Sequence, residues 1–158
     1  MIDLQEIDQE EQVIVYSENR KQNKNDVLFF LHKMLLLSTF LQNQGLVSIF
    51  ISQLHLSPFY KTVDKFSSLI YACMMNDYPM VRLLLHFEYK NEFGESLNLS
   101  EKINKIGGKD KNTCLHYAAK NNNREIFNLL VEKGADQLKQ NYFDLIPLDL
   151  ATDPYFLE

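Results

Sequence analysis

The chain has 158 residues, of which 46% are hydrophobic, 23% charged and 12% aromatic, a composition typical of a soluble globular protein and not of a disordered one. The formal net charge of −5 argues against a nucleic-acid binder that works through an overall positive field. The two cysteines, Cys73 and Cys114, are too few for a disulfide scaffold or a cysteine-rich zinc site.

Residues 1–26 form an acidic, polar leader with seven acidic and three basic side chains. A secretory signal needs a basic start and an apolar stretch, and a mitochondrial presequence needs arginine without acids. Neither pattern is present, so we expect a cytoplasmic protein, with the nucleus as the alternative compartment. Residues 19–26 are expected to form a turn or linker. A single domain should then span residues 27–158.

The domain starts with an apolar stretch, residues 27–41, in which eleven of fifteen side chains are apolar. A membrane span needs about 20 such residues, and His32 and Lys33 interrupt this one. We therefore expect no membrane insertion. A buried helix within a helical array explains the same residues, because a helix that is apolar on most faces needs neighbours on both sides.

An internal repeat follows. Residues 64–84 and 110–130 share Asp, Lys, Leu, Tyr, Ala, Asn, Leu and Leu at the same places without a gap. Residues 147–151 match residues 114–118 at a spacing of 33, and residues 36–51 keep apolar side chains when the same spacing is applied backwards from residue 69. Self-similarity at such a period indicates a repeat architecture.

The best copy reads KDKNTCLHYAA over residues 109–119, then Ile126-Phe127, Leu129-Leu130 and Gly134-Ala135-Asp136. This pattern resembles the ankyrin repeat, whose family pattern runs G-x-T-P-L-H-x-A-A, then I-V-x-x-L-L, then G-A-D. Lys111 stands where a turn glycine is usual in that family, Cys114 stands where proline is usual, and Asn122 replaces the glycine between the two helices. The resemblance extends over residues 109–151, 62–86 and 27–56.

The residues themselves predict two short helices per copy. Leu115, Ala118 and Ala119 share one face of the first helix, and an apolar face over residues 126–131 marks the second. Thr113 is a good N-cap, and Gly134 fits a helix stop. Each pair is too small to bury its own face, so stacking must stabilise it. We predict an all-α, ankyrin-type stack of three to four helix-turn-helix repeats, with the last copy complete or partial.

The spacing of 46 between two copies places an insertion of 13 residues within residues 86–108. Residues 100–106 are expected to form a short capped helix. The aromatic residues Phe87, Tyr89 and Phe93 make a binding loop one interpretation, and a surface loop whose rings pack back on the array the other. A cluster of four lysines at positions 102, 105, 109 and 111 could attract an acidic partner or form a solvated face.

No catalytic, cofactor or metal site is predicted. The pair Cys114-x-His116 is similar to a metal motif, but both residues belong to the repeat, and the resemblance implies structural hydrogen bonds for His116. Cys73 occupies the place of Ala119 and is expected to be a small core residue. The sequence holds no HExxH, no phosphate-binding glycine loop and no G-x-S-x-G elbow.

The resemblance implies a non-catalytic module that binds a protein partner through its concave and hairpin surface, as an adaptor or regulator. A structural accessory subunit of a larger assembly, or a fragment of a longer ankyrin-repeat protein, is the alternative, and an enzyme with an unrecognised site is the third hypothesis. No nucleic-acid partner is expected. The predicted partner-binding residues flank the turns or lie on the exposed side of the first helices: Val63, Asp64, Phe66, Met74, Met75, Lys109, Asp110, Asn112, Tyr117, Lys120, Asn121, Tyr142, Phe143 and Leu145.

Overall fold

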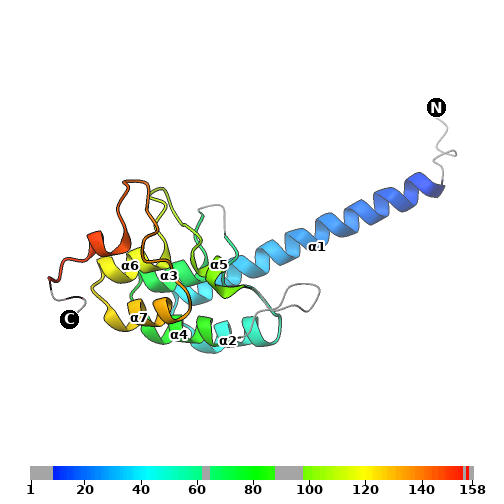
Figure 1. Cartoon of the computed structure of the whole chain (residues 1–158). Coiled ribbons are helices and arrows are strands. Elements are labelled where there is room, and N and C mark those ends of the chain that lie inside the picture. The colour runs from blue at the N-terminus through cyan, green and yellow to red at the C-terminus, as the bar shows by residue number, and fades with distance from the viewer. Residues whose placement is uncertain (1–8, 62–64, 88–97, 155, 157–158) are drawn as a thin grey trace. The chain divides into compact units, whose positions relative to one another are not determined.

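The computed structural model describes residues 9–61, 65–87, 98–154 and 156, with side chains described from residue 25 onward. In these ranges the regular elements are helices, and the only pairing of extended backbone is an isolated bridge between Gly107 and Asn112. The elements are α1 (Gln9–Phe40), α2 (Gln44–Ser52), α3 (Ser68–Met74), α4 (Tyr78–His86), α5 (Leu99–Ile103), α6 (Cys114–Lys120), α7 (Arg124–Glu132) and the 3₁₀ helix η1 (Pro147–Leu150) (Figure 1).

The chain divides into two compact units, residues 1–31 and residues 32–158. In the first unit the turn or linker expected at residues 19–26 is wrong, because α1 is helical through these residues. No glycine or proline lies between residues 9 and 40, and the glutamates, glutamines, lysines and arginine there are good helix formers. The polar composition of residues 19–26 therefore does not interrupt the helix.

The apolar stretch at residues 27–41 forms a helix up to Phe40, as expected, but it is not buried on most faces. In the first unit Val27 and Phe30 are 54% and 60% exposed. In the second unit Leu35 is buried, whereas Leu37 and Leu41 are largely exposed. No helix among the described residues combines the length and the apolarity that crossing a membrane requires.

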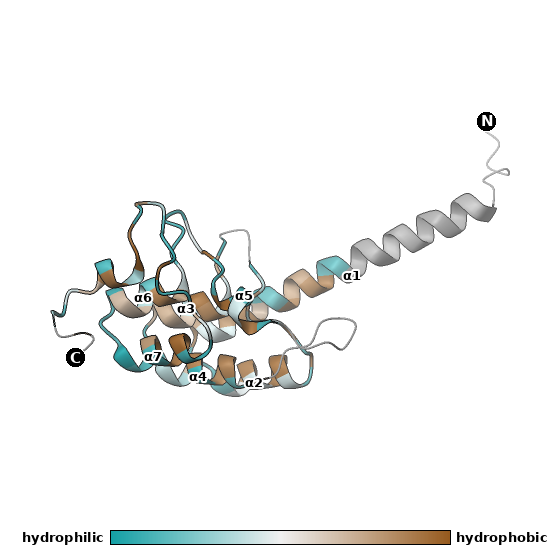
Figure 2. Ribbon diagram, viewed as in Figure 1, coloured by the Kyte–Doolittle hydropathy of each residue, from teal (hydrophilic) through white to brown (hydrophobic). Residues whose placement is uncertain are grey.

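The second unit consists of two layers of short helices (Figure 1). Helices α3 and α6 pack side by side in one layer, and α4 lies between α2 and α7 in the other. Each hairpin joins the layers, since α3 packs on α4 and α6 on α7. The buried side chains of these helices form the core, and the apolar residues along the helices appear brown in Figure 2.

Most of the predicted apolar face of the third copy is confirmed as core, since Leu115, Ala118, Ala119, Ile126, Phe127 and Leu130 are buried. Leu129 and Val131, which were expected on the same face, are only half-buried. Thr113 is the N-cap of α6, and Gly134 follows the C-cap of α7 with a φ of 92°. Only glycine adopts that conformation without steric cost, so the helix ends where the sequence predicts.

The turn between paired helices is built in the same way three times. The first residue of the turn has a positive φ. The side-chain oxygen of the second residue caps the next helix, because it accepts the backbone N–H of the residue three positions later, at 2.9–3.0 Å. The positive-φ residues are Gln42, Asn76 and Asn122, and the caps are Asn43, Asp77 and Asn123. Asn43 precedes Asp77 by 34 residues, so the spacing of 33 expected for the first copy is one residue too short.

The tips that precede each first helix repeat as well. Lys65, Lys111 and Asp144 have φ values of 62°, 55° and 59° and lie 46 and 33 residues apart. The last copy continues as η1, and Phe156 is buried against Phe127, with ring centroids 5.1 Å apart in an edge-to-face arrangement. An aromatic side chain thus covers the end of the described stack.

The insertion carries a short helix where one was expected, but α5 starts one residue earlier, at Leu99 with Asn98 as its N-cap, and ends three residues earlier, at Ile103. The Ser100 hydroxyl and the Asn104 amide both donate to the Gly134 carbonyl, at 2.9 and 3.0 Å. These bonds fasten α5 to the end of α7. Phe87 is half-buried, whereas Tyr89 and Phe93 lie outside the described residues.

Candidate functional site

The tips of successive copies lie against one another on one side of the stack (Figure 1). The Tyr142 amide donates to the Asp110 carbonyl at 2.8 Å, which joins the last two tips. A Cβ built on Gly107 would stand 3.2 Å from the Lys65 carbonyl oxygen, so the second tip touches the base of the third. The loops therefore form a continuous surface rather than three separate projections.

Asn141 organises the last tip from a nearly buried position. Its Oδ1 accepts the amides of Phe143 and Leu145 at 2.9 and 3.2 Å, and its Nδ2 donates to Asn112 Oδ1 at 2.9 Å. The Asn141 amide in turn donates to the Leu145 carbonyl at 3.0 Å. This network fixes the backbone on both sides of Tyr142 and Phe143 and ties it to the neighbouring tip.

Two aromatic side chains project from this loop into solvent. Tyr142 is 63% exposed and Phe143 is 59% exposed, with their rings edge to face at 5.4 Å between centroids. The Lys111 ammonium lies 5.5 Å from the Tyr142 ring centre, within range of a cation–π interaction. We call Lys111, Tyr142 and Phe143 the tip patch.

Leu138, 75% exposed on the same loop, was missed by the sequence analysis, which had no signal to separate it from ordinary loop residues.

Below the tips, aromatic side chains pack closely around Gly108. Gly108 has a φ of 68°, and a Cβ placed there would come within 2.9 Å of the Phe66 ring and 3.7 Å of the Tyr117 hydroxyl. Phe66 and Tyr117 are both half-buried, and Phe66 also meets Tyr71 edge to face. Burial, as the main cause, raises the pKa of Tyr117, while a hydrogen bond with Asn112 opposes the rise.

The structure separates the predicted contact residues into distinct environments. Lys109, Asp110, Lys120 and Met75 are exposed, and Met74 is half-buried. Val63 and Asp64 lie outside the described residues.

Two predicted contact residues have structural partners instead of free side chains. Asn112 was expected to flank an open turn, but it is buried and its Oδ1 accepts from Asn141. Asn121 is exposed, yet its amide donates to the Cys73 carbonyl at 3.0 Å and so links adjacent copies. Both positions hold the tips and turns in place.

His116 has the structural hydrogen bonds that the resemblance implied. It is completely buried, and its Nδ1 accepts the Thr113 amide at 3.2 Å. Its Nε2 lies 3.0 Å from the Leu145 carbonyl oxygen, so the proton is assigned to Nε2, which donates. Burial lowers the pKa of His116. The neutral ring therefore connects the N-cap of α6 to the half-buried tip residue Leu145.

The cysteines lie in the core. Both are buried with free thiols, and burial, followed by a hydrogen bond with the Cys114 thiol, raises the pKa of Cys73 well above its ordinary value. A buried, protonated thiol is a poor nucleophile. Within the described ranges, no cluster of three or more His, Cys, Asp or Glu side chains could hold a metal ion.

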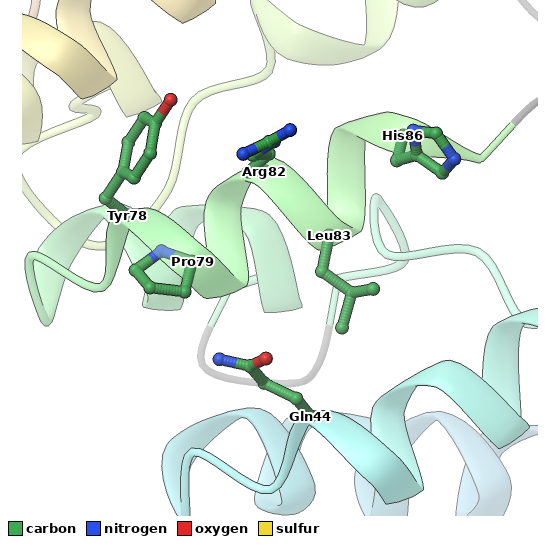
Figure 3. A pocket seen from close by; sticks show the side chains of 6 residues that line it. All are labelled: Gln44, Tyr78, Pro79, Arg82, Leu83 and His86. Atoms are coloured by element: carbon green, nitrogen blue, oxygen red, sulfur yellow. The ribbon is translucent and has the colours of Figure 1, made fainter.

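A groove of about 410 Å³ lies elsewhere, between α4 and the start of α2 (Figure 3). Leu83 and Gln44 point toward one another across it, and Tyr78, Pro79, Arg82 and His86 complete its lining. None of the predicted contact residues lines this groove, because the resemblance directs attention to the tips and first helices.

Comparison with known proteins agrees with this architecture. The family model for ankyrin repeats matches the chain as three copies over residues 14–141. No match to a curated protein accompanies it. The repeated turn, the repeated tip and the two-layered stack of the structure are consistent with this match. The chain belongs to the ankyrin-repeat family.

Proposed function

We propose that this chain is a non-catalytic binding module whose tip patch contacts a protein partner, in the role of an adaptor or regulator in the cytoplasm. Ankyrin repeats are generally protein–protein interaction modules. The proposal rests on one observation. Tyr142 and Phe143 are exposed on a loop whose backbone is hydrogen-bonded to the Asn141 side chain.

Aromatic side chains are enriched among the residues that dominate binding energy in interfaces. An exposed aromatic pair on a mobile loop would lose much of that energy to ordering. Here the backbone amides of Phe143 and Leu145 are already hydrogen-bonded in the free protein. Binding therefore loses little conformational entropy of the loop. Lys111, placed over the Tyr142 ring, restricts that side chain further.

The test is peptide display on the immobilised full chain, followed by affinity measurements on the selected peptides. The variant Tyr142→Ala/Phe143→Ala should lose roughly tenfold or more in affinity, since a hot-spot residue contributes at least about 2 kcal/mol. The matched control is Leu41→Ala/Leu54→Ala, which removes two exposed apolar side chains outside the tips. Equal affinity of the tip variant and the wild type, with both folded, would refute the proposal.

A specific observation favours a second candidate, an accessory subunit of a larger assembly. Leu46 is 45% exposed, whereas Met80 and Ile126, which follow the caps of α4 and α7 in the same way, are completely buried. The first copy therefore exposes a position that the later copies cover. If this candidate is correct, Leu46→Asp should prevent co-purification with a partner while the tip variant does not.

A further inference from the structure

We propose that the partner segment bound at the tip patch is acidic, with several Asp or Glu side chains that face a lysine cluster beside the patch. We define the cluster as Lys61, Lys65, Lys105 and Lys109; Lys111 of the patch follows Lys109 by two residues in the sequence. This inference rests on the proposed function above and specifies the chemistry of its partner.

The lysines of the cluster come from two neighbouring tips. Lys65 stands at the positive-φ position of the second tip, and its carbonyl lies against Gly107 of the third. Lys105 and Lys109 flank Gly107 in the sequence. Burial, followed by the charges of Lys105 and Lys65, lowers the pKa of Lys61, so each of these two lysines repels the Lys61 ammonium. An opposite charge arriving from a partner would relieve that repulsion.

The local charge is the reverse of the charge of the chain as a whole. Residues 61–65 and 98–112 carry six lysines and three acidic residues, whereas the whole chain has a net charge of −5. A positive region on a negatively charged protein attracts a short acidic segment by its local potential. Lys111, two residues after Lys109, adds a further positive charge at the aromatic patch, with its ammonium 5.5 Å from the Tyr142 ring centre.

A protein segment fits this surface better than a nucleic acid does. Nucleic-acid affinity depends on neutralising many phosphates, and the overall negative charge opposes a long polyanion. The cluster contains no arginine, the side chain best suited to phosphate forks and to stacking on bases. Phe143 instead offers an apolar contact for an aliphatic or aromatic side chain between the acids.

The experiment uses the peptides selected by display on the full chain and compares two triple variants. The cluster variant, Lys61→Gln/Lys65→Gln/Lys105→Gln, removes three of the four charges of the cluster. Arg82→Gln/Arg124→Gln/Lys133→Gln is the matched control, because it removes the same number of charges from exposed positions on α4 and at the two ends of α7. Circular dichroism and thermal unfolding establish that both variants remain folded.

The selected peptides should be enriched in Asp and Glu, and their affinity should fall at least about tenfold in the cluster variant and less than about twofold in the control. Raising the salt concentration should weaken binding by the wild type more than binding by the cluster variant, because the variant has fewer charges to screen. Peptides that need Tyr142 and Phe143 but carry no excess of acids would overturn this inference and leave the proposed function intact. Peptides that bind independently of Tyr142 and Phe143, or no binding peptides at all, would overturn both.

A second arm uses a 20-nucleotide single-stranded RNA as a probe. No binding at physiological salt is expected. RNA binding that the cluster variant abolishes, in the absence of acidic peptides from the display, would contradict the proposal in favour of a nucleic-acid surface.

Discussion

The substitution Asn141→Ala should loosen the last tip without removing any residue that contacts a partner. It deletes three side-chain hydrogen bonds, to the Phe143 and Leu145 amides and to Asn112 Oδ1. At about 1 kcal/mol for each bond, the free energy of unfolding should fall by roughly 2–3 kcal/mol. The bonds to the Phe143 and Leu145 amides are only partly buried, so water can replace part of them, and this favours the lower end of the range.

Urea unfolding gives the stability, and amide hydrogen exchange gives the local effect. The Phe143 and Leu145 amides should exchange faster in the variant, because each loses its acceptor. Affinity for the selected peptides should fall even though Tyr142 and Phe143 are intact. The control Asn128→Ala, at an exposed position of α7, should change stability by no more than about 0.5 kcal/mol. If Asn141→Ala behaves like that control in both measurements, the reasoning that the tip is preorganised is wrong.

Three further predictions concern stability. Burial lowers the pKa of His116 in the folded state, so the imidazole binds a proton more readily in the unfolded chain. Urea unfolding should therefore show that stability falls as the pH drops below about 6.5, and that it falls less in His116→Gln. Equal pH dependence in the two proteins would contradict this prediction. Phe156→Ala should cost about 2–4 kcal/mol by uncovering Phe127, and a loss under 1 kcal/mol would mean that the end of the stack needs no cover. Gln42→Gly should be about 1 kcal/mol more stable than Gln42→Ala because φ is 54° there; equal melting temperatures would exclude that strain.

The local features of the repeat could be predicted because they depend on nearby residues. Asn122 stands where a turn needs positive φ, Thr113 caps its own helix, and Ile126 and Leu130 share a face by spacing alone. These signals are contained within a few residues. The identities between residues 64–84 and 110–130 then identified the copies.

Features that depend on the stacking of distant segments could not be predicted. Nothing near Asn141 shows that it joins two tips, since its partner Asn112 lies 29 residues away. The exposure of Leu37 and Leu41 depends on what covers α1 and not on their own apolarity. The one-residue shift of the first copy also escaped detection, because apolar residues alone do not define a register as the caps Asn43 and Asp77 do.

The central claim is that the tips, and not the groove beside α4, receive the protein partner. Two-dimensional NMR of the labelled full chain, titrated with one of the selected peptides, tests it most directly. The amide signals that shift should cluster in residues 105–112 and 138–145. Shifts concentrated at Tyr78, Arg82 and His86 instead, with the tip signals unchanged, would contradict it.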